Sequence, residues 1–345
     1  MIDVDTSARP FFGIEITRQC NLRCPHCFTA SGGAAHPGPS TEAICRLLSD
    51  LAKSSIRSVA FSGGEPLLRK DLATVISYGK SCGLSDFGLV TNGYFATPSL
   101  VKDLADAGLL TVQVSIDGVD ATDHRKVRNC GPADYHRALR ALRLFKECGV
   151  TTYVATIISP RNVERVAEMA LFCEALGVAG LRYCTFVPKG RATNAEQMDA
   201  YHVRPNMLDD FIEFIQSLNA APSVSLPITI DHAIGPWSSS GAFCCESGKR
   251  VAYVSAEGNL YPCPSLISEP FRVGNVFDTP VNELLEHPAM SRVRQIPRQH
   301  LRGPCATCSN QGCRGGCRGA AYAFTGDVHG ANPYCYFCNA HTNSR

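Results

Sequence analysis

The chain has 345 residues and a net charge of +2, with 19% charged and 45% hydrophobic residues. These values indicate a globular protein of about two domains and exclude a disordered chain. The small net charge argues against binding to nucleic acid or to an anionic membrane surface. No apolar stretch approaches the length of about 18 residues that a membrane-spanning helix needs.

Cysteine is the unusual component, with 18 residues. They gather towards the two ends of the chain in short spacings, and the first ten residues lack the apolar core of a signal peptide. Such spacings in a chain without an export signal favour metal ligands over disulfides. We therefore expect a cytoplasmic protein with thiolate metal sites.

From residue 11 to about residue 190, short apolar runs alternate with amphipathic helical patterns. The strand-like runs are residues 11–17, 57–62, 86–91, 111–116, 151–158 and 180–187. Pro98 after Thr97 predicts a helix start, and Gly108, Gly149 and Gly177 predict helix ends.

Six consecutive βα units predict a parallel sheet with right-handed crossovers. A closed barrel of this type needs eight strands. We therefore expect an α/β fold with a partial, TIM-like (β/α)6 barrel rather than a flat doubly wound sheet.

The composition changes twice after the predicted barrel. Residues 191–243 contain one expected helix at 206–218 and the linker-like stretches APSVSLP and GPWSSSG. From Cys244 onward the regular alternation stops, and a region so poor in long apolar runs needs metal sites as staples. The expected domains are residues 1–190, 191–243 and 244–345.

The first cysteine group, Cys20, Cys24 and Cys27, forms a C-x₃-C-x₂-C run directly after the first expected strand. The carboxyl end of barrel strands carries the chemistry in parallel barrels. Structural zinc sites use four protein ligands, whereas three thiolates can hold three irons of a [4Fe–4S] cluster and leave the fourth iron open. A zinc site completed by His26 or His36 is the alternative.

This cysteine run resembles that of the radical S-adenosylmethionine (SAM) enzymes, in which an aromatic-type residue commonly precedes the third cysteine; His26 fills that place. The stretch SGGEP (62–66) resembles the GGE motif of the same family. Glycine at Gly63 and Gly64 allows close backbone approach, and Glu65 is an acceptor suited to the SAM ammonium group.

Two later stretches also match the family. TNGY contains Asn92, and SIDG contains Ser115, which the resemblance places against SAM. DHRKVRN resembles the HDxxR segment, with His124 and Arg128 at its ends, and the guanidinium of Arg128 suits the SAM carboxylate. Arg125 stands where the family usually has aspartate, so it is a rival for this role.

The resemblance implies SAM as cofactor and a known reaction type. A reduced cluster donates one electron to SAM, methionine leaves, and a 5′-deoxyadenosyl radical abstracts a substrate hydrogen, while the barrel positions the substrate and excludes water. A flavodoxin- or ferredoxin-type protein is the implied electron donor.

The C-terminal cysteines resemble the SPASM extension of radical SAM enzymes, which holds two auxiliary iron–sulfur clusters. Carried over, the first auxiliary cluster would be held by Cys245, Cys263 and Cys317. The second would be held by Cys305, Cys308, Cys313 and Cys335. Three [4Fe–4S] clusters per chain are therefore expected, with zinc as the alternative in this region.

Three points stay open in this region. Cys338 is a rival of Cys335. Family members with a complete first auxiliary site have a further cysteine where this chain has Ser239. Cys244 is then a fourth ligand, a hydrogen donor to a substrate radical, or an inert buried thiol.

Modification of a peptide by crosslinking, thioether formation, epimerisation or oxidation is the first expected function. About ten residues precede the first expected strand, so we expect a separate peptide-recognition protein or direct capture by the barrel. The second is epimerisation or dehydrogenation of a small molecule, such as an aminoglycoside or a cofactor precursor. A non-enzymatic iron–sulfur electron carrier is the third.

Overall fold

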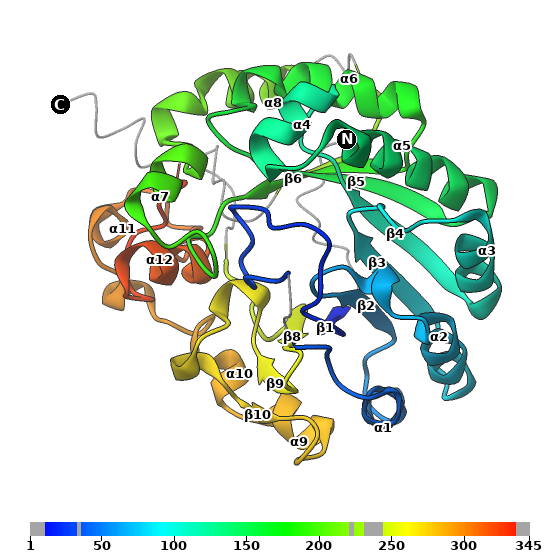
Figure 1. Cartoon of the computed structure of the whole chain (residues 1–345). Coiled ribbons are helices and arrows are strands. Elements are labelled where there is room, and N and C mark those ends of the chain that lie inside the picture. Colours follow the sequence, from blue (N-terminus) through cyan, green and yellow to red (C-terminus); the bar gives the residue numbers. More distant parts are fainter. Residues whose placement is uncertain (1–10, 33–35, 221–223, 231–243, 336–345) are drawn as a thin grey trace.

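The computed structural model describes residues 11–32, 36–220, 224–230 and 244–335. The strands of these residues form one sheet in the order β10-β9-β8-β1-β2-β3-β4-β5-β6-β7. Their bounds are β1 Phe11–Glu15, β2 Ser58–Ser62, β3 Asp86–Thr91, β4 Leu109–Ser115, β5 Thr151–Ile158, β6 Gly180–Thr185, β7 Ile228–Ile230, β8 Val251–Val254, β9 Asn259–Tyr261 and β10 Gly274–Asn275. Figure 1 shows that β1 to β6 curve into an open arc, so the barrel is partial.

Helices cover the convex side of this arc (Figure 1). Those that follow the barrel strands are α1 Thr41–Ala52, α2 Leu72–Ser81, α3 Pro98–Ala107, α4 Ala121–Arg128, α5 Pro132–Glu147, α6 Val166–Leu176, α7 Ala195–Tyr201 and α8 Asp209–Ala220. The C-terminal part adds α9 Val281–Glu286, α10 Ala289–Arg292, α11 Pro304–Thr307 and α12 Arg318–Thr325. No helix in the described ranges is long and apolar enough to cross a membrane.

Side chains that alternate between the two faces of each strand build the main hydrophobic core. Phe12 and Ile14 of β1 are buried in one apolar cluster with Ile44 and Leu48 of α1. The intervening Gly13 faces the other way, where a Cβ would lie 2.8 Å from the ring of Tyr253. Because successive strand side chains alternate between faces, the apolar positions join sheet to helices and the others face the barrel interior.

The expected helix signals are confirmed. The Thr97 hydroxyl accepts the backbone N–H of Leu100 at the start of α3. Gly108, Gly149 and Gly177 follow α3, α5 and α6 with positive φ angles of 114°, 77° and 61°. Glycine adopts this conformation without a steric cost, which is why it ends these helices.

The sheet extends beyond the six predicted strands on both sides. β7 pairs in parallel with β6, and β8 pairs in parallel with β1. The helix expected at 206–218 corresponds to a short 3₁₀ turn, Pro205–Met207, and to α8 after it. Helix α7 was not predicted from the sequence. The linker-like GPWSSSG stretch lies outside the described residues.

Candidate functional site

The loop of residues 16–32, here called the cluster loop, follows β1 and lies at the centre of the arc of strands (Figure 1). Its backbone is hydrogen-bonded to the GGE segment, from Gly64 N to Thr17 O (2.7 Å) and from Glu65 N to Gln19 O (2.8 Å). A Cβ at Gly63 would stand 2.2 Å from the Thr17 carbonyl oxygen, and one at Gly64 would stand 2.1 Å from that of Gln19. Only glycine therefore permits this approach.

The cluster loop brings its three thiols together. The backbone N–H of Cys27 donates to Cys24 O (3.1 Å). Burial raises the pKa of Cys20 to about 11, and the neighbouring Cys24 and Cys27 act in the same direction. Three adjacent, partly buried thiols are the donor set of a three-cysteine iron–sulfur site, and bound metal would deprotonate them.

Asn92 and Glu65 lie on one side of this thiol group. The Asn92 side-chain amide is 3.8 Å from Cys20 Sγ and donates to Asn21 Oδ1 (2.9 Å). The buried Glu65 carboxylate accepts hydrogen bonds from Thr91 Oγ1 (2.6 Å), Leu67 N (3.0 Å) and Asn92 N (2.8 Å). Glu65 thus fixes the position of Asn92. The contact of Glu65 with SAM stays a prediction.

Arg128 lies on another side, beside the second cysteine. Its Nε donates to Asp117 Oδ2 (2.5 Å), and NH1 is 3.9 Å from Cys24 Sγ. Burial is the largest effect on the pKa of Asp117 and raises it, but Arg128, the two nearby histidines and the backbone hydrogen bond together outweigh it, and the pKa is lowered. Arg125 instead lines a hollow, so the structure brings Arg128 and not its rival to the thiols.

Asp117 belongs to the SIDG stretch, yet the sequence did not single it out. Besides Arg128, it accepts the backbone N–H of Ile157 on Oδ1 (2.7 Å), and its own N–H donates to His124 Nδ1 (3.1 Å). Burial first, and Arg128 second, lower the pKa of His124 to about 4, so this ring is neutral. Asp117 therefore orients Arg128. The sequence signal that could have identified Asp117 is an acidic residue directly after a barrel strand.

His26 is also neutral, because burial and then Arg128 lower its pKa to about 4. Its Nδ1 donates to Val127 O (3.2 Å), and its ring centroid is 5.3 Å from that of Tyr201. His36 Nδ1 accepts the N–H of Gly38 (3.0 Å). Both histidines considered for zinc therefore have partners within the protein.

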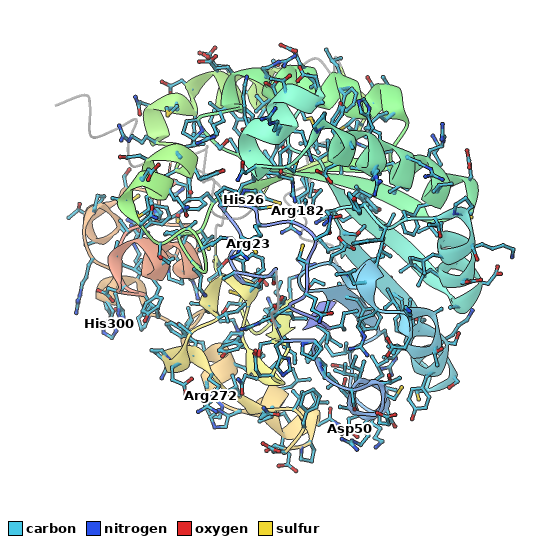
Figure 2. The ribbon with its side chains drawn as sticks, viewed as in Figure 1. Arg23, His26, Asp50, Arg182, Arg272 and His300 are labelled. Atoms are coloured by element: carbon cyan, nitrogen blue, oxygen red, sulfur yellow. The ribbon has the colours of Figure 1, made fainter. Side chains whose placement is uncertain are left out.

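The barrel interior behind the cluster loop contains further polar groups. Ser115 of β4 is in register with Ala155 of β5, which is in register with Arg182 of β6. Residues in register share a face of the sheet, so Arg182 lies on the face that carries Ser115. In the view of Figure 2, Arg23, His26 and Arg182 are labelled over the centre of the molecule.

The segment Lys189–Gly190–Arg191, after β6, holds the cluster loop and was missed by the sequence analysis. The guanidinium of Arg191 donates to the carbonyls of Cys24 (3.0 Å), Ala30 (3.3 Å) and Ser31 (2.5 Å). A Cβ at Gly190 would stand 2.5 Å from Cys27 O. A K-G-R triplet at a strand end was the only signal for this contact.

Lys189, at the other end of that segment, reaches the C-terminal cysteines. Its Nζ donates to Ser265 O (3.2 Å). Burial lowers its pKa to about 8, opposed by the nearby Cys263 thiol. One three-residue segment therefore contacts both the cluster loop and the first C-terminal thiol group.

The C-terminal thiols form two groups. Burial raises the pKa of Cys263, and the next contributions come from Cys245 and Cys317. Burial likewise raises the pKa of Cys313, with Cys335 and Cys305 as its thiol neighbours. These two groups contain six of the seven cysteines of the expected auxiliary sets, and Cys308 is the seventh.

The loop that carries Cys308 is ordered by a residue missing from the sequence analysis. The Arg298 guanidinium donates to the carbonyls of Asn310 (2.5 Å), Cys313 (2.9 Å) and Cys308. Cys244 is half-buried next to Cys245, and its three possible roles stay open. Ser239 and Cys338 lie outside the described residues.

No disulfide joins cysteines of the described ranges. Within those ranges, no three or more His, Cys, Asp and Glu side chains are spaced to hold a single metal ion.

Comparison with known proteins gives two family matches. Residues 14–173 match the Radical SAM superfamily, and residues 244–309 match SPASM, an iron–sulfur cluster-binding domain. The AdoMet-dependent heme synthase of Methanosarcina barkeri is 27% identical over 96% of this chain and 97% of its own. The pre-heme d1 synthase of Dinoroseobacter shibae is 29% identical, over 96% and 87%. The mycofactocin maturase MftC of Mycolicibacterium smegmatis is 28% identical, over 93% and 81%.

Solved structures share the fold at lower identity. SuiB of Streptococcus suis bound to S-adenosylmethionine superposes with a TM-score of 0.73 at 14% identity, covering 94% of this chain and 76% of its own. The structure of anSMEcpe with bound AdoMet gives a TM-score of 0.71 at 20% identity, over 96% and 94%.

Proposed function

Because this chain is a radical SAM enzyme with an iron–sulfur SPASM domain, we propose that it cleaves SAM reductively and modifies a peptide substrate by hydrogen abstraction. Cys20, Cys24 and Cys27 would hold the cluster, which when reduced would supply the electron for SAM cleavage and so the means of hydrogen abstraction. The observation that carries the proposal is the set of three neighbouring cysteines, Cys20, Cys24 and Cys27. Asn92 lies beside Cys20, and Arg128 lies beside Cys24.

We assign the remaining roles by residue. Arg128, kept charged and oriented by Asp117, receives the SAM carboxylate. The backbone at Gly63 and Gly64 contacts SAM. Glu65 accepts and Asn92 donates hydrogen bonds at the amino acid part of SAM, and Ser115 faces SAM from β4. Neutral His26 contributes a ring beside the adenine and no charge.

We propose three [4Fe–4S] clusters, one in the cluster loop and two in the SPASM-type region, with the sets given above. The division into residues 1–190, 191–243 and 244–345 is the corresponding functional division. Lys189 and Arg191, which touch both regions, would keep the first auxiliary site in a fixed position relative to the cluster loop.

The substrate is proposed to be a peptide that presents a carboxylate to the barrel. Arg182 lies on the sheet face that carries Ser115, and Arg23 belongs to the cluster loop. Guanidinium groups bind carboxylates in bidentate geometry. Support for a peptide comes from the mycofactocin maturase relative and from the fold shared with SuiB, which has been solved with its precursor peptide SuiA.

A carboxylate-bearing tetrapyrrole is the second candidate. It is favoured by the heme synthase relative, which aligns along 96% of this chain and 97% of its own length. The same two arginines would bind its acidic side chains.

We place the enzyme in the reducing cytoplasm, where thiol ligands stay unoxidised. A separate peptide-recognition protein and a flavodoxin- or ferredoxin-type reductant are the proposed partners.

The experiment is anaerobic incubation of the iron-loaded protein with SAM and dithionite, with and without candidate substrates. 5′-Deoxyadenosine formation tests the radical chemistry. A mass change in a short peptide encoded beside this gene supports the first candidate, and a mass change only in an iron tetrapyrrole supports the second. Absence of 5′-deoxyadenosine from fully loaded protein with either substrate contradicts the proposal.

A further inference from the structure

A hollow of about 490 Å³ lies between the cluster loop, α4 and α7. Its lining comes from α4, from the turn after β5 and from α7, together with Pro25 of the cluster loop. Pro25 is the residue next to Cys24. The hollow therefore lies beside the cluster loop, next to its second cysteine.

The lining of the hollow is basic in a protein that is almost neutral. Arg125, Lys126 and Arg161 oppose one acid, Glu196. Asp123 balances Lys126 in an ion pair of 2.9 Å and also contacts Arg165. Arg161 donates to the neutral carbonyl of Lys126 (2.7 Å) and so keeps its full charge.

An aromatic pair connects the hollow to the thiols. The Arg161 guanidinium lies 5.2 Å from the centroid of the Tyr201 ring, which lines the hollow. The Tyr201 and His26 ring centroids are 5.3 Å apart, and His26 precedes Cys27 directly. The Tyr201 hydroxyl donates to Val127 O (2.7 Å), the same carbonyl that His26 contacts. This packing gives a short, rigid route from the surface to the cluster loop.

We propose that this hollow is the docking surface of a small acidic protein that carries a flavin or an iron–sulfur centre and delivers single electrons to the first cluster. The inference rests on the proposed function, because that chemistry needs one electron for each SAM cleaved. On docking, the carrier is oxidised by one electron and the cluster is reduced by one. Charge complementarity speeds such encounters without requiring a large interface.

The test uses iron-loaded protein and a reduced flavodoxin, mixed anaerobically in a stopped-flow instrument. Reduction of the first cluster is followed as the part of the loss of visible absorbance that is absent from the variant with Cys20, Cys24 and Cys27 changed to alanine. The variant Arg125→Glu/Arg161→Glu reverses the two unbalanced charges. The control Arg46→Glu/Arg140→Glu makes the same charge change at exposed positions of α1 and α5. Arg125→Glu alone is the milder variant should the Arg161 change disturb Tyr201.

We expect about a tenfold or larger fall in the rate of reduction by flavodoxin at low ionic strength for the double variant, and a smaller fall for Arg125→Glu. Added salt should slow the wild type more than the double variant. Reduction by dithionite and iron content should stay unchanged, as should all properties of the control. A wild-type rate with flavodoxin, or an equal loss with dithionite, overturns the proposal. Cluster reduction is measured without SAM, so an enzyme that fails to cleave SAM refutes the proposed function and leaves this result standing.

Discussion

Two cysteine loops in this molecule are shaped by the same device. In the cluster loop, Arg191 donates to three backbone carbonyls, including that of Cys24; in the loop of residues 308–313, Arg298 does the same, including the carbonyl of Cys308. The difference is in the origin of the arginine. Arg191 is 167 residues from Cys24, whereas Arg298 is 10 residues from Cys308.

This difference shows how each loop gets its shape. The cluster loop also contacts the GGE glycines after β2, Asn92 after β3 and Arg128 at the end of α4, which come from separate βα units of the barrel. The second loop depends on nearby residues in a region of short elements. We infer that the barrel forms the first site in advance, while the C-terminal sites need their metal to become rigid.

The largest expected effect comes from the combined change of Cys20, Cys24 and Cys27 to alanine. It should abolish SAM cleavage and lower the iron content from about twelve to about eight per chain, because three four-iron clusters are proposed. Iron analysis and 5′-deoxyadenosine assays measure both. SAM cleavage by the triple variant would place the radical site elsewhere.

Gly63→Ala tests how strictly the barrel shapes the first loop. The new Cβ would meet Thr17 O at 2.2 Å at a φ of +139°, so the loop must move, and we expect most of the first cluster to be lost. Gly83→Ala is the matched control, because its φ is +100° but nothing lies within 4 Å of the Cβ. Equal iron loss in both variants would show that backbone strain, and not the loop contact, is responsible.

A matched pair of arginine changes tests the comparison directly. Lysine cannot donate to three spread carbonyls as a guanidinium does. Arg298→Lys should therefore lower the iron content of the C-terminal sites severalfold after brief chelator treatment. Arg191→Lys should change the retention of the first cluster about twofold, since other barrel contacts remain. The reverse ranking would refute the inference that the barrel forms the first site in advance.

The smallest effect concerns Glu15, whose Oε2 accepts the N–H of Ala256 (3.0 Å) and so joins β1 to the C-terminal region. Burial raises its pKa from 4.5 to about 7. The folded protein therefore holds a proton that the unfolded chain releases, and this stabilisation is complete below pH 4.5 and lost as the pH rises through 7. Glu15→Gln should be more stable than wild type at pH 8 by on the order of 2–3 kcal/mol, and less so at pH 5.

Anaerobic denaturant unfolding of both proteins at the two pH values measures this difference, because groups common to both cancel. The same stability difference at pH 5 and pH 8 would mean that Glu15 is ionised throughout.

The sequence predicted the barrel and its helix ends because period-two and helical patterns, proline and glycine are local signals. The resemblance also supplied three cysteine sets, which stay predictions as cluster ligands. The sequence did not reveal the pairing of β8 with β1, since the two strands are far apart in the chain. Nor did it reveal Asp117, Arg191 or Arg298, because an acid or an arginine in a loop looks like any solvated residue until the fold supplies its partners.

The position of β1 between β2 and β8 also constrains how the protein is made. The first strand gains its second neighbour only when Val251–Val254 has left the ribosome. At roughly 5–20 residues per second, synthesis of the intervening chain takes on the order of tens of seconds. During that time one edge of β1, just before the cluster loop, is open to pairing with another chain. Iron insertion into the first loop and protection of this edge are thus separate steps in biogenesis, and expression at lower temperature or with a chaperone that covers strand edges should raise the yield of loaded enzyme.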